Sequence, residues 1–199
     1  MKNDPRYFDR AYYERFYGNP KTRVLDPEYF YKLGQFVCSY IGYLELPVKR
    51  VLDIGCGLGL WKELVEWYFP GAKYHGVEYG DYLCKRCGWE RGSVVDYRSR
   101  RPFDFVICQS VLPYLDARSA RRAIENLGAL CRGVLYLEAV TSEDLEQDVV
   151  DVRRMDRTMI LRSERWYRKC LRSHFIFLGG GVWLSRRAGV PMFALERGD

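Results

Sequence analysis

From residue 50 onward the sequence alternates short apolar runs with segments of helical periodicity, and this alternation limits the possible folds more than any other feature. The apolar runs are residues 50–54, 74–78, 93–95, 103–108, 133–139, 175–178 and 191–195. The helical segments are residues 60–69, 117–130 and 163–171. Strands that alternate with helices form a parallel sheet covered by helices on both faces. The last two runs have no room for a crossover helix between them, so we expect an antiparallel pair at one edge.

The length and composition fit one globular domain. The chain has 199 residues, of which 48% are hydrophobic, and a chain of this size can bury a core without metal or disulfide support. We expect an aromatic-rich helical cap at residues 1–45 and the core at residues 46–199. Within the cap, tyrosines and phenylalanines spaced by four residues predict a short helix over 12–17. A second helix is expected over 27–44, because a proline follows an aspartate at its start.

The sequence contains no pattern typical of export, membrane insertion or metal binding. No run approaches the roughly 20 apolar residues that a membrane-spanning helix needs, and the N-terminus leads into no apolar leader segment. The seven cysteines are an odd number and fit reduced thiols in a cytoplasmic protein. Cys84 and Cys87 form the only CxxC pair, whereas a zinc site of this kind would need a second pair. We therefore expect no metal, and interpret this pair as two thiols on one helical face.

A glycine-rich turn after the first apolar run is the strongest functional signal. The run Val51-Leu52-Asp53-Ile54-Gly55-Cys56-Gly57-Leu58-Gly59 reads as a buried strand, a glycine turn and the start of a helix. Glycines let the backbone pass close to a ligand and expose N–H groups at a helix N-terminus. A dinucleotide site would have a glycine where Leu60 stands, so an NAD-dependent enzyme is the least favoured alternative. The acidic Asp53 before the turn favours a cationic group over a pyrophosphate.

A second carboxylate stands at the end of the next apolar run. Glu78 closes the run of residues 74–78, where a carboxylate can accept hydrogen bonds from both hydroxyls of a ribose. Alone, such a residue is equally typical of a solvated strand end. The glycine turn that precedes it in the chain makes a nucleoside site the better interpretation.

These motifs occur in an order that resembles one family. The segments 51–59, 76–78, 92–96 and 103–115 follow each other as in the class I S-adenosylmethionine-dependent methyltransferases. The resemblance covers residues 50–140 most strongly. It implies an α/β three-layer sandwich whose seven-stranded, mostly parallel sheet has an antiparallel last strand. It also implies S-adenosyl-L-methionine as cofactor, with S-adenosyl-L-homocysteine as product, over the carboxyl ends of the first, second and fourth strands.

The resemblance assigns cofactor-binding roles to particular positions. The cradle for the methionine part of the cofactor would consist of Asp53, Gly55, Cys56, Gly57 and Gly59. Glu78 would hold the ribose, with Tyr79 packed beside it, and Gln109 would contact the cofactor after the fourth strand. Many relatives have an acidic residue after the third strand that meets the adenine amino group. The matching position here is Ser93 or Asp96, and Val94 would contribute its backbone.

The acceptor is less strongly indicated. The Asn/Asp-Pro-Pro-Tyr pattern of amino-methylating nucleic-acid enzymes is absent after the fourth run, which reads Gln109-Ser110-Val111-Leu112-Pro113-Tyr114. A small-molecule acceptor is therefore favoured, with Tyr114 as the candidate to orient it or to act as an acid or base. Tyr12, Tyr13 and Tyr17 are candidate acceptor contacts in a lid. For each of these four tyrosines, packing in the core is the alternative.

Two other classes of function stay open. Residues 151–199 carry the basic excess of the chain, and its arginines include a helical stripe over 162–172. Such a stripe can contact RNA or DNA, although a solvated helix face is the favoured interpretation. RNA, DNA or protein are therefore alternative acceptors, and a non-catalytic protein that binds S-adenosylmethionine is a further alternative. The sequence does not determine the oligomeric state.

Overall fold

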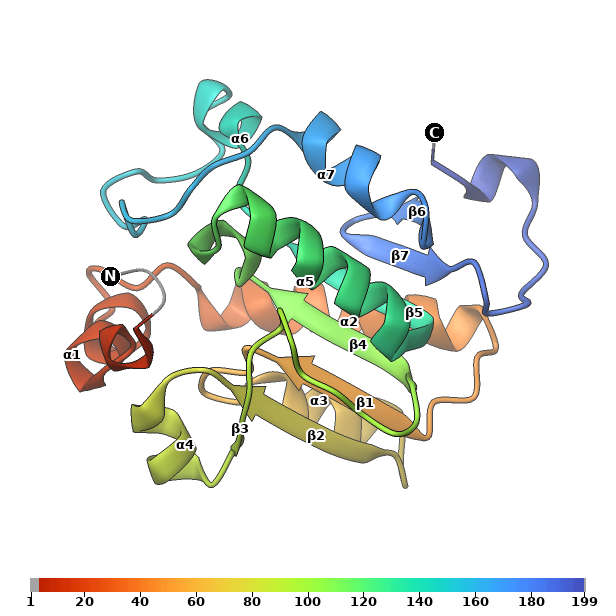
Figure 1. The fold of residues 1–199 in the computed structure, drawn as a ribbon, viewed down its shortest axis with the longest axis horizontal. Helices are drawn as coiled ribbons and strands as arrows, with labels where there is room; N and C mark the ends of the chain where they lie inside the picture. The colour runs from red at the N-terminus through yellow and green to blue at the C-terminus, as the bar shows by residue number, and fades with distance from the viewer. Residues whose placement is uncertain (1–3, 199) are drawn as a thin grey trace.

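A seven-stranded sheet forms the centre of the molecule in the computed structural model, which describes residues 4–198 (Figure 1). Its strands are β1 (Arg50–Ile54), β2 (Lys73–Glu78), β3 (Glu90–Arg91), β4 (Phe103–Gln109), β5 (Cys131–Glu138), β6 (Phe175–Gly179) and β7 (Val182–Ser185). They lie in the order β3-β2-β1-β4-β5-β7-β6. β7 pairs antiparallel with both β5 and β6, and the other neighbouring pairs of the sheet are parallel. The predicted fold class, with its antiparallel pair at one edge, is confirmed.

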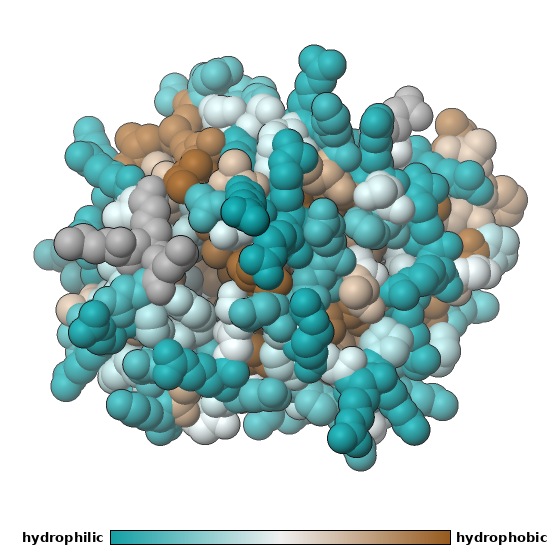
Figure 2. Space-filling view, viewed as in Figure 1, coloured by the Kyte–Doolittle hydropathy of each residue, from teal (hydrophilic) through white to brown (hydrophobic). Residues whose placement is uncertain are grey.

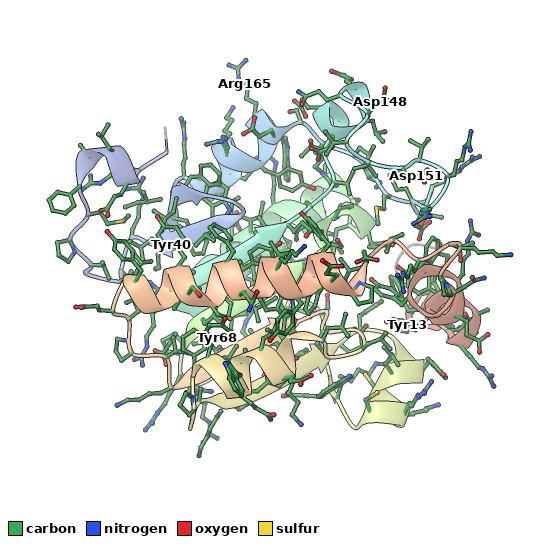
Figure 3. The ribbon with its side chains drawn as sticks, turned by 180° about the vertical axis from the view of Figure 1, so that it is seen from behind. Tyr13, Tyr40, Tyr68, Asp148, Asp151 and Arg165 are labelled. Carbon is green, nitrogen blue, oxygen red and sulfur yellow. The ribbon has the colours of Figure 1, made fainter. Side chains whose placement is uncertain are left out.

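Helices cover both faces of this sheet. The helices α2 (Pro27–Tyr43) and α3 (Trp61–Tyr68) lie on the face seen in Figure 3. The opposite face, seen in Figure 1, carries α5 (Ala117–Leu130) and α7 (Glu164–Leu171). Successive residues of a strand point to opposite faces. Accordingly, Phe105 packs in the core beneath α2 and α3, and Val106 packs beneath α5 and α7.

Residues 5–18, the first part of the predicted cap of residues 1–45, form a small cap, and residues 1–3 lie outside the described part of the chain. It comprises η1 (Pro5–Tyr7), α1 (Arg10–Tyr13) and the π-helical turn η2 (Glu14–Gly18), so the short helix predicted here is confirmed. The cap lies beyond the carboxyl ends of β1, β2 and β4 (Figure 1). Asp26 then accepts hydrogen bonds from the first backbone N–H groups of α2, as the aspartate–proline pair predicted.

Two strand predictions are wrong in position. Residues 191–195 are no strand: they lead into η4 (Ala194–Glu196), and the side chains of Phe193 and Leu195 are exposed. The last strand is instead β7, which follows a turn of three glycines with positive φ at positions 179–181. The third strand pairs only through Glu90 and Arg91 with the end of β2, so residues 93–95 belong to the following turn.

Four short elements complete the chain. They are α4 (Asp81–Cys87), η3 (Leu112–Tyr114), α6 (Ser142–Glu146) and η4. The face that includes α5 is largely hydrophilic, with an apolar patch near the segment between α6 and α7, where Val149 and Val152 are exposed (Figure 2). Within residues 4–198, no helix has both the length and the apolar character needed to cross a membrane.

Candidate functional site

The glycine turn joins β1 to α3 and is tied to β2. The backbone N–H groups of Gly55 and Cys56 donate to the carbonyl of Val77, at 2.8 and 3.1 Å. A Cβ atom at Gly59, which has φ of 74°, would lie 2.5 Å from the Trp89 ring. A Cβ at Gly57 would meet only Tyr13, at 3.9 Å. Gly59 is therefore a packing requirement, and Gly57 is the glycine that faces open space.

Glu78 is held at the end of β2 by backbone donors. Its carboxylate accepts hydrogen bonds from the N–H groups of Gly57, Tyr79 and Gly80, each at 2.8 Å. The residue is only 4% exposed. Burial raises the pKa of Glu78, and the three backbone hydrogen bonds oppose that rise. The carboxylate thus joins the glycine turn to β2 and presents fixed acceptor oxygens to the space above them.

Asp53 lies buried at the end of β1. It accepts a hydrogen bond of 2.6 Å from the hydroxyl of Tyr74, and it is 2% exposed. Burial raises the pKa of Asp53 to about 7, because the charged carboxylate loses its hydration. A cationic ligand group beside it would favour the ionised form.

Cys56 occupies the glycine turn beside these carboxyl groups. Its side chain is buried, and burial together with the charges of Asp53 and Glu78 raises its pKa. The residue is therefore a neutral thiol at physiological pH. All seven cysteines are free thiols. Within residues 4–198, no group of three or more His, Cys, Asp or Glu side chains is placed to hold a metal ion.

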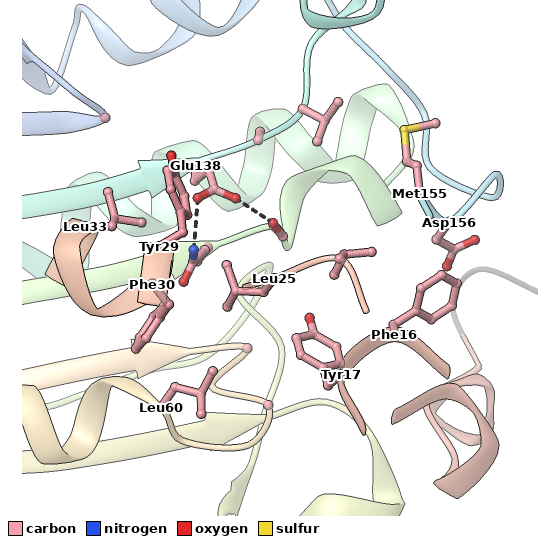
Figure 4. A pocket seen from close by; sticks show the side chains of 18 of the residues that line it. Phe16, Tyr17, Leu25, Tyr29, Phe30, Leu33, Leu60, Glu138, Met155 and Asp156 are labelled. Atoms are coloured by element: carbon pink, nitrogen blue, oxygen red, sulfur yellow. Dashed lines mark hydrogen bonds between the residues drawn. The ribbon is translucent and has the colours of Figure 1, made fainter. Parts of the chain in front are cut away.

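Two adjoining cavities open above the carboxyl ends of the strands. The smaller has a volume of 320 Å³ and is lined by Glu78, Tyr79, Ser93, Val94 and Asp96, among others. The larger, of 690 Å³, lies between the cap, α2 and the segment that follows β5 (Figure 4). Residues that line both cavities mark their junction. They are Tyr12, Tyr17, Gly55, Gly57, Gln109, Ser110 and Tyr114.

A hydrogen-bond network fixes the polar groups at this junction. The Trp61 indole N–H donates to Gln109 Oε1 at 2.8 Å, and Gln109 Nε2 donates to Glu138 at 2.9 Å. The Ser110 hydroxyl donates to the other oxygen of Glu138, also at 2.9 Å (Figure 4). Glu138 stands at the end of β5, next to Gln109 in the register of the sheet. The amide and the carboxylate therefore have one defined orientation toward the larger cavity.

The cap closes over the junction through tyrosine hydroxyls. The hydroxyl groups of Tyr12 and Tyr114 lie 2.7 Å apart. Burial raises the pKa of both groups, so both keep their protons at neutral pH. Tyr7 donates a hydrogen bond of 2.8 Å to Asp156, which belongs to the segment between α6 and α7. The cap is thus linked both to the loop after β4 and to the segment after β5.

Most residues singled out from the sequence lie around these cavities. Of the fifteen candidate residues, only Gly59 lines neither cavity, because Trp89 covers it. The basic residues of α7 also lie outside both cavities. The sequence predictions missed Glu138, Ser110 and Asp156. A signal for Glu138 was available, since it closes a strand as Glu78 does.

Comparison with solved structures identifies the fold. A methyltransferase from Clostridium acetobutylicum that depends on S-adenosylmethionine matches 85% of this chain and 87% of its own, with a TM-score of 0.62 and 13% identity. The N-methyltransferase NodS of Bradyrhizobium japonicum, solved with S-adenosyl-L-homocysteine, matches 92% and 100%, with a TM-score of 0.57 and 16% identity. The chain has the class I methyltransferase fold. Within this fold, the glycine turn, Glu78 and both cavities lie at the carboxyl edge of the sheet.

Sequence comparison covers a smaller part of this methyltransferase fold. Trans-aconitate 2-methyltransferases of Pseudomonas paraeruginosa and Pseudomonas aeruginosa are 28% identical to the chain over 75 residues. This match spans 34% of the chain and 27% of the length of each relative. No family model matches the chain.

Proposed function

We propose that this protein is an S-adenosylmethionine-dependent methyltransferase that acts on a small molecule. The observation that carries the proposal is the buried Glu78 carboxylate, bound to the Gly57 N–H at the wall of a 320 Å³ cavity. The fold and the name of the curated relatives support the same activity. Cavities of these sizes are typical of small-molecule sites.

The chemistry of the lining residues fits this cofactor. Three backbone N–H groups already donate to the Glu78 carboxylate, so it offers its remaining acceptor position to a hydroxyl of the ribose. Asp53, on the side of the larger cavity, would pair with the ammonium group of the methionine part. Tyr79, Ser93, Val94 and Asp96 line the end of the smaller cavity and would surround the adenine. Gly57, which has no side chain, keeps the passage between the two cavities open.

The chain mainly has to position the acceptor and exclude water. When bound, S-adenosylmethionine supplies a methyl group already activated by its sulfonium sulfur. The cap covers the junction, where Tyr12 and Tyr114 present a hydrogen-bonded pair of hydroxyl groups. Because both tyrosines keep their protons, we assign them the orientation of the acceptor rather than the removal of its proton.

The alternative acceptors and the alternative role receive less support. The basic stripe of α7 lies outside both cavities, so it would not bring RNA or DNA to the glycine turn. A purely binding role would not need the cap residues to line both cavities.

The unpaired state of all seven cysteines supports a cytoplasmic location.

Calorimetric titration with three ligands tests the proposal. We expect binding of S-adenosylmethionine and S-adenosyl-L-homocysteine, and no heat with NAD. If neither adenosyl ligand binds to a protein shown to be folded by circular dichroism, the cofactor assignment is contradicted. Retention on RNA or DNA that weakens with salt would instead favour a nucleic-acid acceptor.

A further inference from the structure

The larger cavity has apolar walls from three separate segments. Tyr29, Phe30 and Leu33 of α2 form one wall, and Phe16 of the cap forms a second. Met155, in the segment after β5, contributes to a third (Figure 4). Walls of this kind bury an apolar body and leave a few polar groups to set its orientation.

The charged side chains that line this cavity are predominantly acidic, although the chain as a whole has a net charge of +6. The carboxyl groups along its lining are those of Asp53, Glu138, Asp144, Asp151 and Asp156. Arg154 is the only basic residue along the same lining within residues 4–198, and its guanidinium lies 3.5 Å from Asp151. An anionic acceptor would therefore meet carboxylates without a free cation to balance them, whereas a cationic acceptor would be attracted.

Glu138 is the carboxylate next to the junction of the two cavities. It accepts hydrogen bonds from Gln109, Ser110 and the hydroxyl of Tyr136, the last at 3.1 Å. A carboxylate can accept about four hydrogen bonds, so one position is left for a donor inside the cavity. Gln109 and Ser110 themselves line both cavities. Glu138, to which both side chains donate, is therefore one side chain away from the smaller cavity, where the cofactor is proposed to bind.

Tyr17 of the cap reaches the junction of the two cavities. It lines both cavities, and burial together with the charges of Glu138 and Glu78 raises its pKa to about 12. Its ring projects from the cap into the cavity (Figure 4). The junction therefore has a neutral phenol that interacts with the carboxyl groups of Glu138 and Glu78.

From this arrangement we infer that the methyl acceptor is an amine on an apolar body, and that Glu138 is the residue that selects it. The inference rests on the proposed methyltransferase function and names the substrate class of the same site. An ammonium group would donate to the remaining position of Glu138. One N–H proton passes to that carboxylate and then to water, and the freed lone pair forms the new N–C bond. The C–S bond to the methyl group breaks as it forms, leaving the thioether S-adenosyl-L-homocysteine and a methylated ammonium product.

Three probes, one cationic and two anionic, test this inference. We would titrate the protein with 4-phenylbutylamine, 4-phenylbutanoate and trans-aconitate, each with and without saturating S-adenosyl-L-homocysteine. The expected result is an amine affinity at least about tenfold above that of either anion, as for a hydrogen bond to a charged partner. Equal affinities, or a preference for an anion, would overturn the inference.

Substitution of Glu138 identifies the residue responsible. Glu138→Gln should reduce the preference for the amine by about tenfold and leave the affinity for S-adenosyl-L-homocysteine unchanged. Glu146→Gln, an exposed residue of α6 outside both cavities, is the matched control and should change neither value. An unchanged preference in folded Glu138→Gln would remove Glu138 from acceptor selection.

Two further measurements test the inference even if the Glu138→Gln variant does not fold or the proposed function is wrong. Val149→Lys places a cation at the exposed rim of the larger cavity and should weaken amine binding even if Glu138→Gln does not fold. An unaltered amine affinity in that variant would count against the acidic cavity. Loss of S-adenosyl-L-homocysteine binding alone would contradict the proposed function, and the titrations without it would still measure the charge preference of the cavity.

Discussion

The proposed donor side of the site, around Glu78, and the proposed acceptor side, beneath the cap, are held together by different kinds of contact. On the donor side, Glu78 is fixed by the backbone N–H groups of Gly57, Tyr79 and Gly80. On the acceptor side, the decisive contacts join side chains far apart in the sequence. Tyr12 and Tyr114 are separated by 102 residues, and Tyr7 and Asp156 by 149.

Backbone hydrogen bonds therefore fix the geometry on one side, and an adjustable arrangement of side chains sets it on the other. A backbone donor survives almost any substitution, so the shape of the donor side depends mainly on glycines and one carboxylate. A side-chain hydrogen bond contributes about 1 kcal/mol and disappears with one substitution. The acceptor side can therefore change its ligand without altering the sheet beneath it.

Gly57→Arg should produce the largest effect on the donor side. Its side chain would project into the open space between the cavities, so we expect no measurable binding of S-adenosyl-L-homocysteine by calorimetry. The positive φ of 52° adds a folding cost of about 1–2 kcal/mol. Gly88→Arg, at φ 72° in the C-cap of α4, has a similar backbone cost and should bind normally. Normal binding by Gly57→Arg would remove the glycine turn from the site.

Glu78→Gln should have the next largest effect. Loss of the carboxylate removes the charged acceptor proposed for a ribose hydroxyl, and we expect the binding free energy of S-adenosylmethionine to weaken by about 1–3 kcal/mol. Titration of Glu90→Gln, an exposed glutamate on the neighbouring β3, supplies the control. If both variants bind like the original protein, Glu78 serves only to connect the turn to β2.

Asp53→Asn tests the buried carboxyl group through pH. The pKa of Asp53 is raised to about 7, so the folded protein holds this proton more tightly than the unfolded chain, whose ordinary value is 3.8. Ionisation therefore lowers stability as the pH rises from about 4 to about 7. The asparagine variant has no carboxyl group to ionise, so its free energy of unfolding should not fall over this pH range. At pH 8 we expect it to exceed that of the original protein by about 1–3 kcal/mol. Urea unfolding at pH 5 and pH 8 measures it, with the exposed Asp148→Asn as control. Parallel pH profiles for Asp53→Asn and the original protein would contradict the prediction.

The hydroxyl pair of the acceptor side should have the smallest effect. A double-mutant cycle of Tyr12→Phe and Tyr114→Phe should give a coupling energy of about 0.5–1.5 kcal/mol in urea unfolding. Tyr43, whose hydroxyl bonds Glu196 on the surface, provides the comparison. Tyr43→Phe and Tyr114→Phe should be additive. If the effects of Tyr12→Phe and Tyr114→Phe on the free energy of unfolding are also additive, the 2.7 Å contact between their hydroxyl groups does not hold the cap.

The fold was largely predictable because most of its strands are short, continuous apolar runs that alternate with helices. The errors came from weak or competing signals. β3 has only two residues and both are exposed, so no hydrophobic pattern marks it. The apolar run at 191–195 resembles a strand more than its surroundings do, but the glycine turn before Val182 brings β7 directly back beside β5.

The parts of the site whose residues lie close together in the sequence were the easiest to predict. Asp53, Gly57 and Glu78 come from two consecutive strand ends, where a short motif specifies their neighbours. Glu138 and Asp156 act through partners that only the folded chain brings near. No spacing in the sequence reveals that Tyr7 reaches Asp156.

The position of Cys56 has a consequence for how long such an enzyme would last. A cysteine in the turn that cradles a methyl donor is a competing nucleophile, and a thiolate there would be alkylated by the enzyme's own cofactor. Because burial and the nearby charges of Asp53 and Glu78 raise its pKa, this sulfur remains a poorly reactive thiol. The carboxylates proposed to hold the cofactor would thereby also protect the enzyme from self-inactivation.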